Sequence, residues 1–170
     1  MSNVSQFIGS GWVPLETIEL TGAVTTVDFD SNIDDTFNNY VVTSTHTVPS
    51  SQLIYCRLKT GDPSATINTG YRSLITYPGT STSSTATNLG QAVLSQYSGS
   101  FITYFMNLRS SDVTKSIVSQ GTGYSGATMF VRDYTNALLN TSIINGIQLF
   151  PSAASSFTAG KFTLYGIKEL

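Results

Sequence analysis

The residues that could do chemistry are few, and three of their spacings match motifs with a known mechanism. The first is the run from Gly121 to Gly126, which spells G-x-G-x-x-G, the glycine pattern of dinucleotide-binding loops. That chemistry needs a strand before the glycines and a helix after them, because the helix N-terminus holds the phosphates. Residues 127–134 have a strand-like pattern instead. We therefore interpret the run as a flexible connection between two strands, and we predict no cofactor.

The second spacing places oxygen-bearing side chains at alternate positions: Asp28, Asp30, Asn32 and Asp34. An EF-hand calcium loop begins in this way. However, Ile33 stands where the loop needs glycine, and Asn39 stands where a bidentate glutamate is needed. Two interpretations stay open, an irregular calcium site and a polar turn whose side chains cap backbone amides. We favour the turn and predict no metal site.

The third spacing is the run from Gly123 to Ala127, which resembles the G-x-S-x-G nucleophile elbow with Ser125 as the nucleophile. The elbow requires a strand-to-helix turn, which is missing here. The one histidine, His46, lies in the polar phase of a strand-like run, so we expect it to be exposed. Nothing places two carboxylates opposite each other, as glycoside hydrolysis requires. We predict no catalytic residue and no enzyme activity.

Composition excludes several classes of protein. The chain has 170 residues and includes 24 Ser and 24 Thr, whereas only 11% of its residues are charged. Eight cations and a net charge of -2 do not make the basic surface that a nucleic-acid reader needs. No apolar run reaches the roughly 18 residues of a membrane helix, and the first residues do not have the pattern of a secretory signal. A single cysteine excludes an internal disulfide framework.

The elements that must position these residues are short strands. Turn signals recur every 8–12 residues or so, and the stretches between them alternate apolar and polar residues, which is typical of an antiparallel sandwich or barrel. We expect the run from Thr80 to Asn88 to be a polar surface loop. In the run from Phe101 to Arg109, the alternate residues that begin with Ile102 and Tyr104 form the more apolar face, which we expect to point into the core. The expected strands cover residues 12–20, 23–29, 40–48, 52–60, 70–77, 91–97, 101–109, 114–120, 128–134, 143–150 and 161–168.

The C-terminal stretch carries a resemblance to a known class of proteins. Residues 143–168 contain a Phe-x-x-Gly turn, at Phe157 and Gly160, followed by Leu-Tyr-Gly-Ile from Leu164 to Ile167. In this they resemble bacteriophage virion proteins of the jelly-roll type, and residues 39–61 look like the matching first half. The resemblance implies an all-β fold, a single jelly-roll-like antiparallel β-sandwich over residues 12–170 with a short N-terminal arm over residues 1–11. It carries over no catalytic or binding residue.

The resemblance also implies a function and a place in the virion. We expect a structural protein of the phage particle surface, a capsid decoration or cement protein on the head. The expected partners are further copies of the chain, as a homotrimer, and the major capsid protein or other virion proteins. Phe7, Ile8 and Trp12 are the candidate assembly interface, with Phe7 and Ile8 in an arm that packs on a neighbouring subunit; the alternative is a frayed terminus.

A second function stays open, a receptor-binding module of a tail fibre or baseplate tip that recognises a host-surface glycan. We expect such a module to gather aromatic and polar residues in one loop cluster around Tyr71, Tyr77 and residues 80–88. A decoration protein should instead present a flat apolar base.

Overall fold

The computed structural model describes residues 11–49, 52–61, 65–76, 83–89, 91–125, 127–152 and 155–168. Within these ranges the regular elements are all strands, joined by turns and irregular segments. The strands are β1 (Trp12–Leu20), β2 (Val27–Phe29), β3 (Asn39–Thr47), β4 (Leu53–Thr60), β5 (Ala65–Thr66), β6 (Tyr71–Thr76), β7 (Ser83–Leu89), β8 (Ala92–Gln96), β9 (Ser98–Met106), β10 (Lys115–Ser125), β11 (Thr128–Leu138), β12 (Gly146–Pro151) and β13 (Ala159–Ile167).

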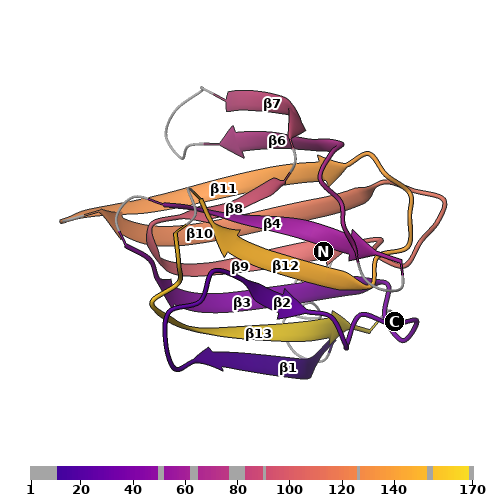
Figure 1. Cartoon of the computed structure of the whole chain (residues 1–170). Helices are drawn as coiled ribbons and strands as arrows, with labels where there is room; N and C mark the ends of the chain where they lie inside the picture. The colour runs from indigo at the N-terminus through magenta and orange to yellow at the C-terminus, as the bar shows by residue number, and fades with distance from the viewer. Residues whose placement is uncertain are drawn as a thin grey trace, which may run out of the picture.

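The strands form two sheets that pack face to face (Figure 1). The larger sheet has eight strands in the order β1-β13-β3-β9-β10-β11-β6-β7. The smaller sheet has the order β2-β12-β4-β5, and β8 also pairs with β4. Neighbouring strands run antiparallel. The prediction of an all-β antiparallel sandwich is confirmed, and the finer jelly-roll assignment stays a prediction.

Alternation of side chains along each strand builds the core between the sheets. In β3, Tyr40 and Val42 are fully buried and face the smaller sheet, and in β4 Ile54, Cys56 and Leu58 are fully buried and face the larger one. The remaining fully buried hydrophobic residues of the core include Phe29, Phe105, Ile117, Leu138, Ile147, Leu149, Phe157, Phe162 and Leu164. Because most side chains of this core are aliphatic or aromatic, burial of apolar surface is the main force that holds the sheets together.

The core face of β9 is the opposite of the predicted one. Phe101, Thr103 and Phe105 are buried, whereas Ile102 and its alternate neighbours in the strand are partly exposed on the outside of the sandwich. Leu108 is buried as expected, but it lies beyond the strand end. The positive φ of 63° at the residue before it changes the direction of the chain there. The prediction was wrong because both faces of this strand are largely apolar.

The glycine run also differs from the prediction, because residues 121–125 form the end of β10 rather than a flexible connection; Gly126 lies outside the described residues. A Cβ on Gly123 would lie 2.4 Å from the carbonyl oxygen of Gln96, and one on Gly99 would lie 2.0 Å from that of Thr122. No side chain fits at such distances. The glycines therefore let the bend between β8 and β9 lie directly against β10.

The run from Thr80 to Asn88, predicted to be a loop, contains most of β7. Residues 83–89 pair antiparallel with β6 at the end of the larger sheet, and residues 80–82 lie outside the described ranges. A strand at this position needs only backbone hydrogen bonds on one side, so a run of Ser and Thr suffices to form it.

Candidate binding surfaces

Two carboxylates of the predicted calcium-like cluster form ion pairs with one lysine. The Lys59 ammonium lies 2.5 Å from Oδ1 of Asp28 and 2.8 Å from Oδ2 of Asp30, and Gln148 Nε2 donates a hydrogen bond of 2.9 Å to Asp28. Burial alone would raise the pKa of Asp28, but the hydrogen bonds from Lys59 and Gln148 hold this pKa below its ordinary value. The absence of a side chain at Gly146 leaves room for the carboxylate of Asp30, since a Cβ there would lie 2.6 Å from its Oδ1.

Asn32 and Asp34, the other two residues of the alternating set, hydrogen-bond to partners outside it. Asn32 donates to the carboxylate of Glu16 at 2.9 Å, and Asp34 accepts a hydrogen bond of 2.9 Å from the backbone amide of Thr36. In the described part of the chain no group of three or more His, Cys, Asp or Glu residues could hold a metal ion. The geometry therefore favours the polar turn over the calcium site.

His46 is buried, with 5% of its surface exposed, so the prediction of an exposed histidine was wrong. Its ring lies among Phe101, Phe157 and Phe162, with centroids 5.5 to 6.3 Å away. Its Nε2 donates to the carbonyl oxygen of Tyr97 at 3.0 Å, and its Nδ1 accepts from the hydroxyl of a serine two residues earlier at 2.8 Å. Burial lowers the pKa of His46 to about 4. Both ring nitrogens are engaged with groups inside the protein, and the ring is packed as part of the core.

What the buried histidine holds in place is a strained link between the two sheets. Tyr97 alone joins β8 to β9 and has a positive φ of 68°, a backbone conformation that costs energy for a residue with a side chain. Its amide donates to the carbonyl of Gln52 at 2.8 Å, and its ring stacks on Phe130 at 4.8 Å. These contacts, with the bond from His46, fix the bend.

Trp12, one of the predicted interface residues, lies on the outer face of the larger sheet within a group of aromatic rings. Its ring centroid is 5.5 Å from that of Tyr165 and 6.0 Å from that of Tyr104. Val41 pairs with both tyrosines across the sheet and is fully buried, although it faces outward. The three rings therefore cover Val41. We call these four residues the aromatic patch.

The aromatic patch continues into neighbouring apolar residues of the same face. Val118 pairs with Tyr104, and Ile167 pairs with Trp12, and both are partly exposed. Around them the face is formed by hydroxyl-bearing residues that bond to one another, such as Ser100 with Thr122 at 2.8 Å. The result is an apolar region within a hydroxyl-rich surface.

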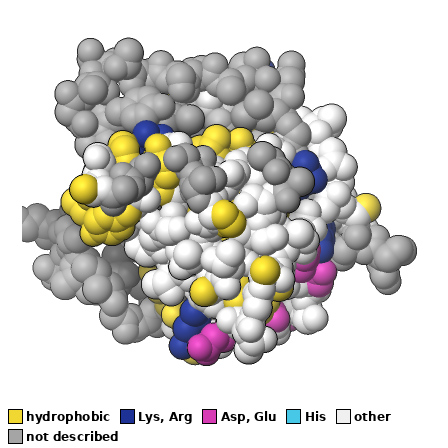
Figure 2. Space-filling model, turned by 60° about the vertical axis from the view of Figure 1, so that its left-hand side comes forward, with side chains coloured by type: hydrophobic (Ala, Val, Ile, Leu, Met, Phe, Trp, Pro, Cys, Tyr) yellow, Lys and Arg dark blue, Asp and Glu magenta, His cyan; other side chains and the backbone are white. Residues whose placement is uncertain are grey.

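The same face ends in a hairpin with three exposed hydrophobic side chains. Tyr124 pairs with Met129 near the turn between β10 and β11, and both are 58% exposed, while Val131 is 40% exposed. Figure 2, which brings this side of the molecule forward, shows hydrophobic side chains gathered in one larger patch and in a few spots on a mostly white surface. The sequence pointed to Tyr124 only as one of several tyrosines near polar loops that could contribute to a binding surface. It did not single out Met129 and Val131, because the glycine run was treated as a connection; their alternation with Thr122 and Tyr124 was the available signal.

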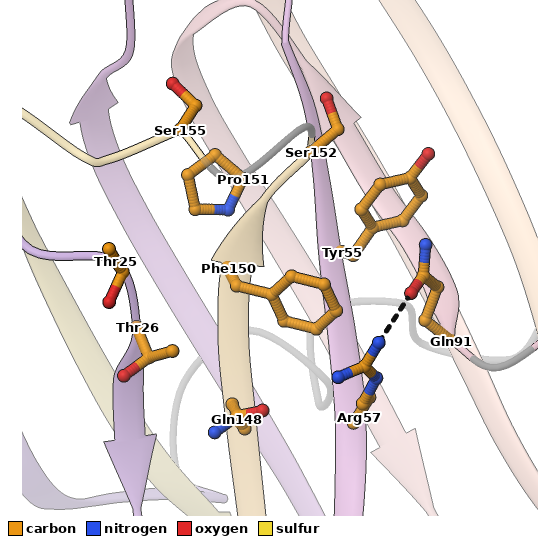
Figure 3. A pocket seen from close by; sticks show the side chains of 10 residues that line it. All are labelled: Thr25, Thr26, Tyr55, Arg57, Gln91, Gln148, Phe150, Pro151, Ser152 and Ser155. Atoms are coloured by element: carbon orange, nitrogen blue, oxygen red, sulfur yellow. Dashed lines mark hydrogen bonds between the residues drawn. The ribbon is translucent and has the colours of Figure 1, made fainter. Parts of the chain in front are cut away.

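The outer face of the smaller sheet carries an open groove of about 390 Å³. Tyr55 and Phe150 lie side by side in it, with ring centroids 5.7 Å apart, and the guanidinium of Arg57 lies 4.5 Å above the Phe150 ring (Figure 3). Arg57 donates a hydrogen bond of 3.1 Å to Gln91. We call it the Tyr55 groove; its lining is Thr25, Thr26, Tyr55, Arg57, Gln91, Gln148, Phe150, Pro151, Ser152 and Ser155.

Not all of the predicted site residues can be placed. Phe7 and Ile8 lie outside the described residues, as does Tyr77. Tyr71 is fully buried, and its hydroxyl accepts a hydrogen bond of 2.7 Å from the amide of Leu58, so it is a core residue and takes no part in a surface loop cluster. Of the predicted interface residues, the described structure places Trp12, at the aromatic patch.

No described helix could span a membrane, since the described elements are strands. No family model, curated protein or solved structure matches the chain.

Proposed function

We propose that the chain is a non-enzymatic structural protein of a phage particle surface, a capsid decoration or cement protein that docks through the aromatic patch. The observation that carries the proposal is the apolar region on the outer face of the larger sheet, which includes Trp12. A flat apolar base is the feature expected of a decoration protein. The resemblance of residues 143–168 to virion proteins supplies the partner class.

The composition of the aromatic patch suits protein docking. Trp and Tyr are enriched among the residues that contribute most to interface affinity, since they bury a large area at a low cost in side-chain entropy. The surrounding hydroxyl groups provide a polar rim that hydrogen-bonds to a partner or to interfacial water. The major capsid protein is the proposed partner, and a homotrimer is the proposed oligomer, in which several patches engage one particle.

The proposal is tested first by immunogold labelling of intact virions from the source. Gold over the head supports a decoration protein, gold at the tail tip favours the receptor-binding module, and no label on any particle overturns a place on the virion surface.

Particles that lack the protein then provide the binding assay. We expect Trp12→Ala to weaken rebinding by about 30-fold, as for an interface residue worth about 2 kcal/mol. Val113→Ala is the control, since Val113 is a similarly exposed hydrophobic residue, 44% exposed, in the loop before β10. Equal rebinding of the two variants would place the interface elsewhere.

The receptor-binding module is the second candidate function, and the Tyr55 groove favours it. It differs from the predicted site, because it is formed by strands of the smaller sheet and not by the region around Tyr71. Glycan screening and the labelling experiment separate the two functions.

A further inference from the structure

We propose that the Tyr55 groove is a binding site for one or two pyranose rings of an uncharged oligosaccharide. The inference stands apart from docking through the aromatic patch, because the groove lies on the outer face of the other sheet. It gives the second candidate function a location and a ligand class.

The groove is built from side chains that strand alternation turns away from the core. In β4, Tyr55 and Arg57 alternate with the buried Ile54, Cys56 and Leu58, and in β12 Phe150 alternates with the buried Leu149. The turn before β2 forms the far wall. Its volume of about 390 Å³ is in the range of small-molecule sites. The floor of the groove is therefore formed by the paired strands β4 and β12, and turn residues complete its walls.

The two aromatic rings provide an apolar platform. They lie 5.7 Å apart and are tilted by 39°, and the guanidinium of Arg57 holds Phe150 in position from 4.5 Å. Gln91 accepts a hydrogen bond from Arg57, and its side chain also lies close to that of Tyr55. A pyranose ring has one face of C–H groups, which pack on an aromatic ring as other apolar groups do. Tyr55, ordered by Gln91, is the residue best placed for this contact.

The rest of the lining provides hydrogen-bonding groups without charge. Gln148 donates its Nε2 to Asp28, and Figure 3 shows its carboxamide oxygen on the side of Phe150. Ser152 is held by a 2.6 Å bond from its hydroxyl to Gln52 and by a 3.1 Å bond from the amide of Leu53. Two threonines and a second serine add further hydroxyl groups. Such groups, fixed in advance, match the alternating donors and acceptors of sugar hydroxyls.

The lining argues against other ligand classes. Arg57 is the one charged residue in it, and its guanidinium is already engaged with Phe150 and Gln91, so an anionic ligand would find no cluster of cations. An extended peptide adds to the exposed edge of a sheet, whereas here the backbones of β4 and β12 are paired with each other. A neutral polyol with one apolar face fits best.

The test is a titration of isotope-labelled full-length protein, followed by NMR, with maltotriose, cellotriose, chitotriose and lactose. We expect at least one of them to shift the backbone signals of β4 and β12 around Tyr55 and Phe150. Tyr55→Ala should weaken that binding at least about tenfold, as loss of an aromatic contact worth about 1.4 kcal/mol. Tyr124→Ala makes the same change at an exposed tyrosine on the larger sheet and should leave binding unchanged.

A second variant keeps the proposal testable if Tyr55→Ala does not fold. Gln91 lies outside the strands, next to β8, so Gln91→Ala keeps the sheet and should still weaken binding, through loss of its bond to Arg57 and of its contact with Tyr55. The proposal is overturned if none of the four saccharides shifts these signals, or if binding survives Tyr55→Ala and Gln91→Ala. Binding of a galacturonic acid trimer in place of the neutral sugars would also overturn it. None of these results affects rebinding to particles through Trp12, so the two proposals fail separately.

Discussion

Replacing Asn136 by alanine should strongly destabilise the sandwich, because this side chain hydrogen-bonds to the backbone of β8 in the way that a neighbouring strand would. Asn136 lies in β11 and is 1% exposed. Its Nδ2 donates to the carbonyl oxygen of Val93 at 2.8 Å, and its Oδ1 accepts from the amide of Val93 at 3.1 Å. The same Oδ1 accepts a hydrogen bond from Ser73. One carboxamide thus satisfies the backbone N–H and C=O of Val93 in β8, a strand that pairs with β4 of the smaller sheet.

The size of the effect follows from the groups left without partners. In Asn136→Ala the buried N–H and C=O of Val93 both lose their hydrogen bonds, and each unpaired buried group costs about 1–3 kcal/mol. We therefore expect a loss of about 2–6 kcal/mol in the free energy of unfolding. Domains of this size are stable by about 5–15 kcal/mol, so the loss is a large part of the total.

Urea unfolding measures the change. Asn136→Ala should lower the denaturation midpoint with no change in the slope m, since the surface exposed on unfolding stays the same. Thr135→Ala is the control, because the neighbouring Thr135 is exposed on the opposite face of the same strand and should change stability by less than about 0.5 kcal/mol. In native-state hydrogen exchange the Val93 amide should lose its protection. A loss below about 1 kcal/mol with an unchanged m would refute the assigned role of Asn136.

Two further predictions concern the bend between the sheets. The pKa of His46 is about 4 in the folded protein, below the ordinary value of 6.5 that applies to the unfolded chain. The unfolded chain therefore binds the proton more readily than the folded protein does. We expect the contribution of His46 to the free energy of unfolding to be constant above about pH 6.5 and to fall by up to about 3 kcal/mol as the pH drops to 4. Thermal unfolding across this range checks it, and a His46→Gln variant with the same pH dependence would contradict it. Gly99→Ala should cost at least about 2 kcal/mol, because its Cβ would lie 2.0 Å from a backbone oxygen. Gly22→Ala, with nothing within 4 Å of the added Cβ, should change the melting temperature little, and equal melting temperatures of the two variants would show that the bend relaxes.

Most strands were predictable from sequence because their local patterns are strong. Residues 40–48 and 161–168 are rich in β-branched and aromatic residues, and the structure has strands at Asn39–Thr47 and Ala159–Ile167. Propensity and alternation suffice there. The bounds were less accurate where few apolar residues mark them, as in β2, which covers only Val27–Phe29 of the expected 23–29.

The face of a strand that enters the core was harder to predict. In β9 both sets of alternate residues are mostly apolar, since Phe101 and Phe105 fill the core while Ile102 and Tyr104 lie on the outer face. Alternation alone cannot rank two apolar faces, and the position of the second sheet decides between them. The second apolar face was itself the sequence signal for the aromatic patch.

The Tyr55 groove could not be predicted, because its residues meet only through long-range pairing. Tyr55 and Phe150 are far apart in the chain and become cross-strand partners when β4 pairs with β12. A single sequence contains the two aromatic residues but not the register that joins them. The same holds for His46 and Tyr97, which are far apart in the chain and come into contact when β3 pairs with β9.

The pairing of β1 with β13 sets an order of events during synthesis. Trp12 faces Ile167 across this pair, and the amide of Lys168 bonds to the carbonyl of Gly11 at 2.8 Å. β1 is made early but finds its partner only after nearly all the residues described here have left the ribosome. Such distant pairing slows folding to milliseconds or seconds and leaves an unpaired strand exposed meanwhile. Pro14 and the acidic side chains of Glu16 and Glu19 lie on β1, where they hinder its association with the strands of other nascent chains until β13 arrives.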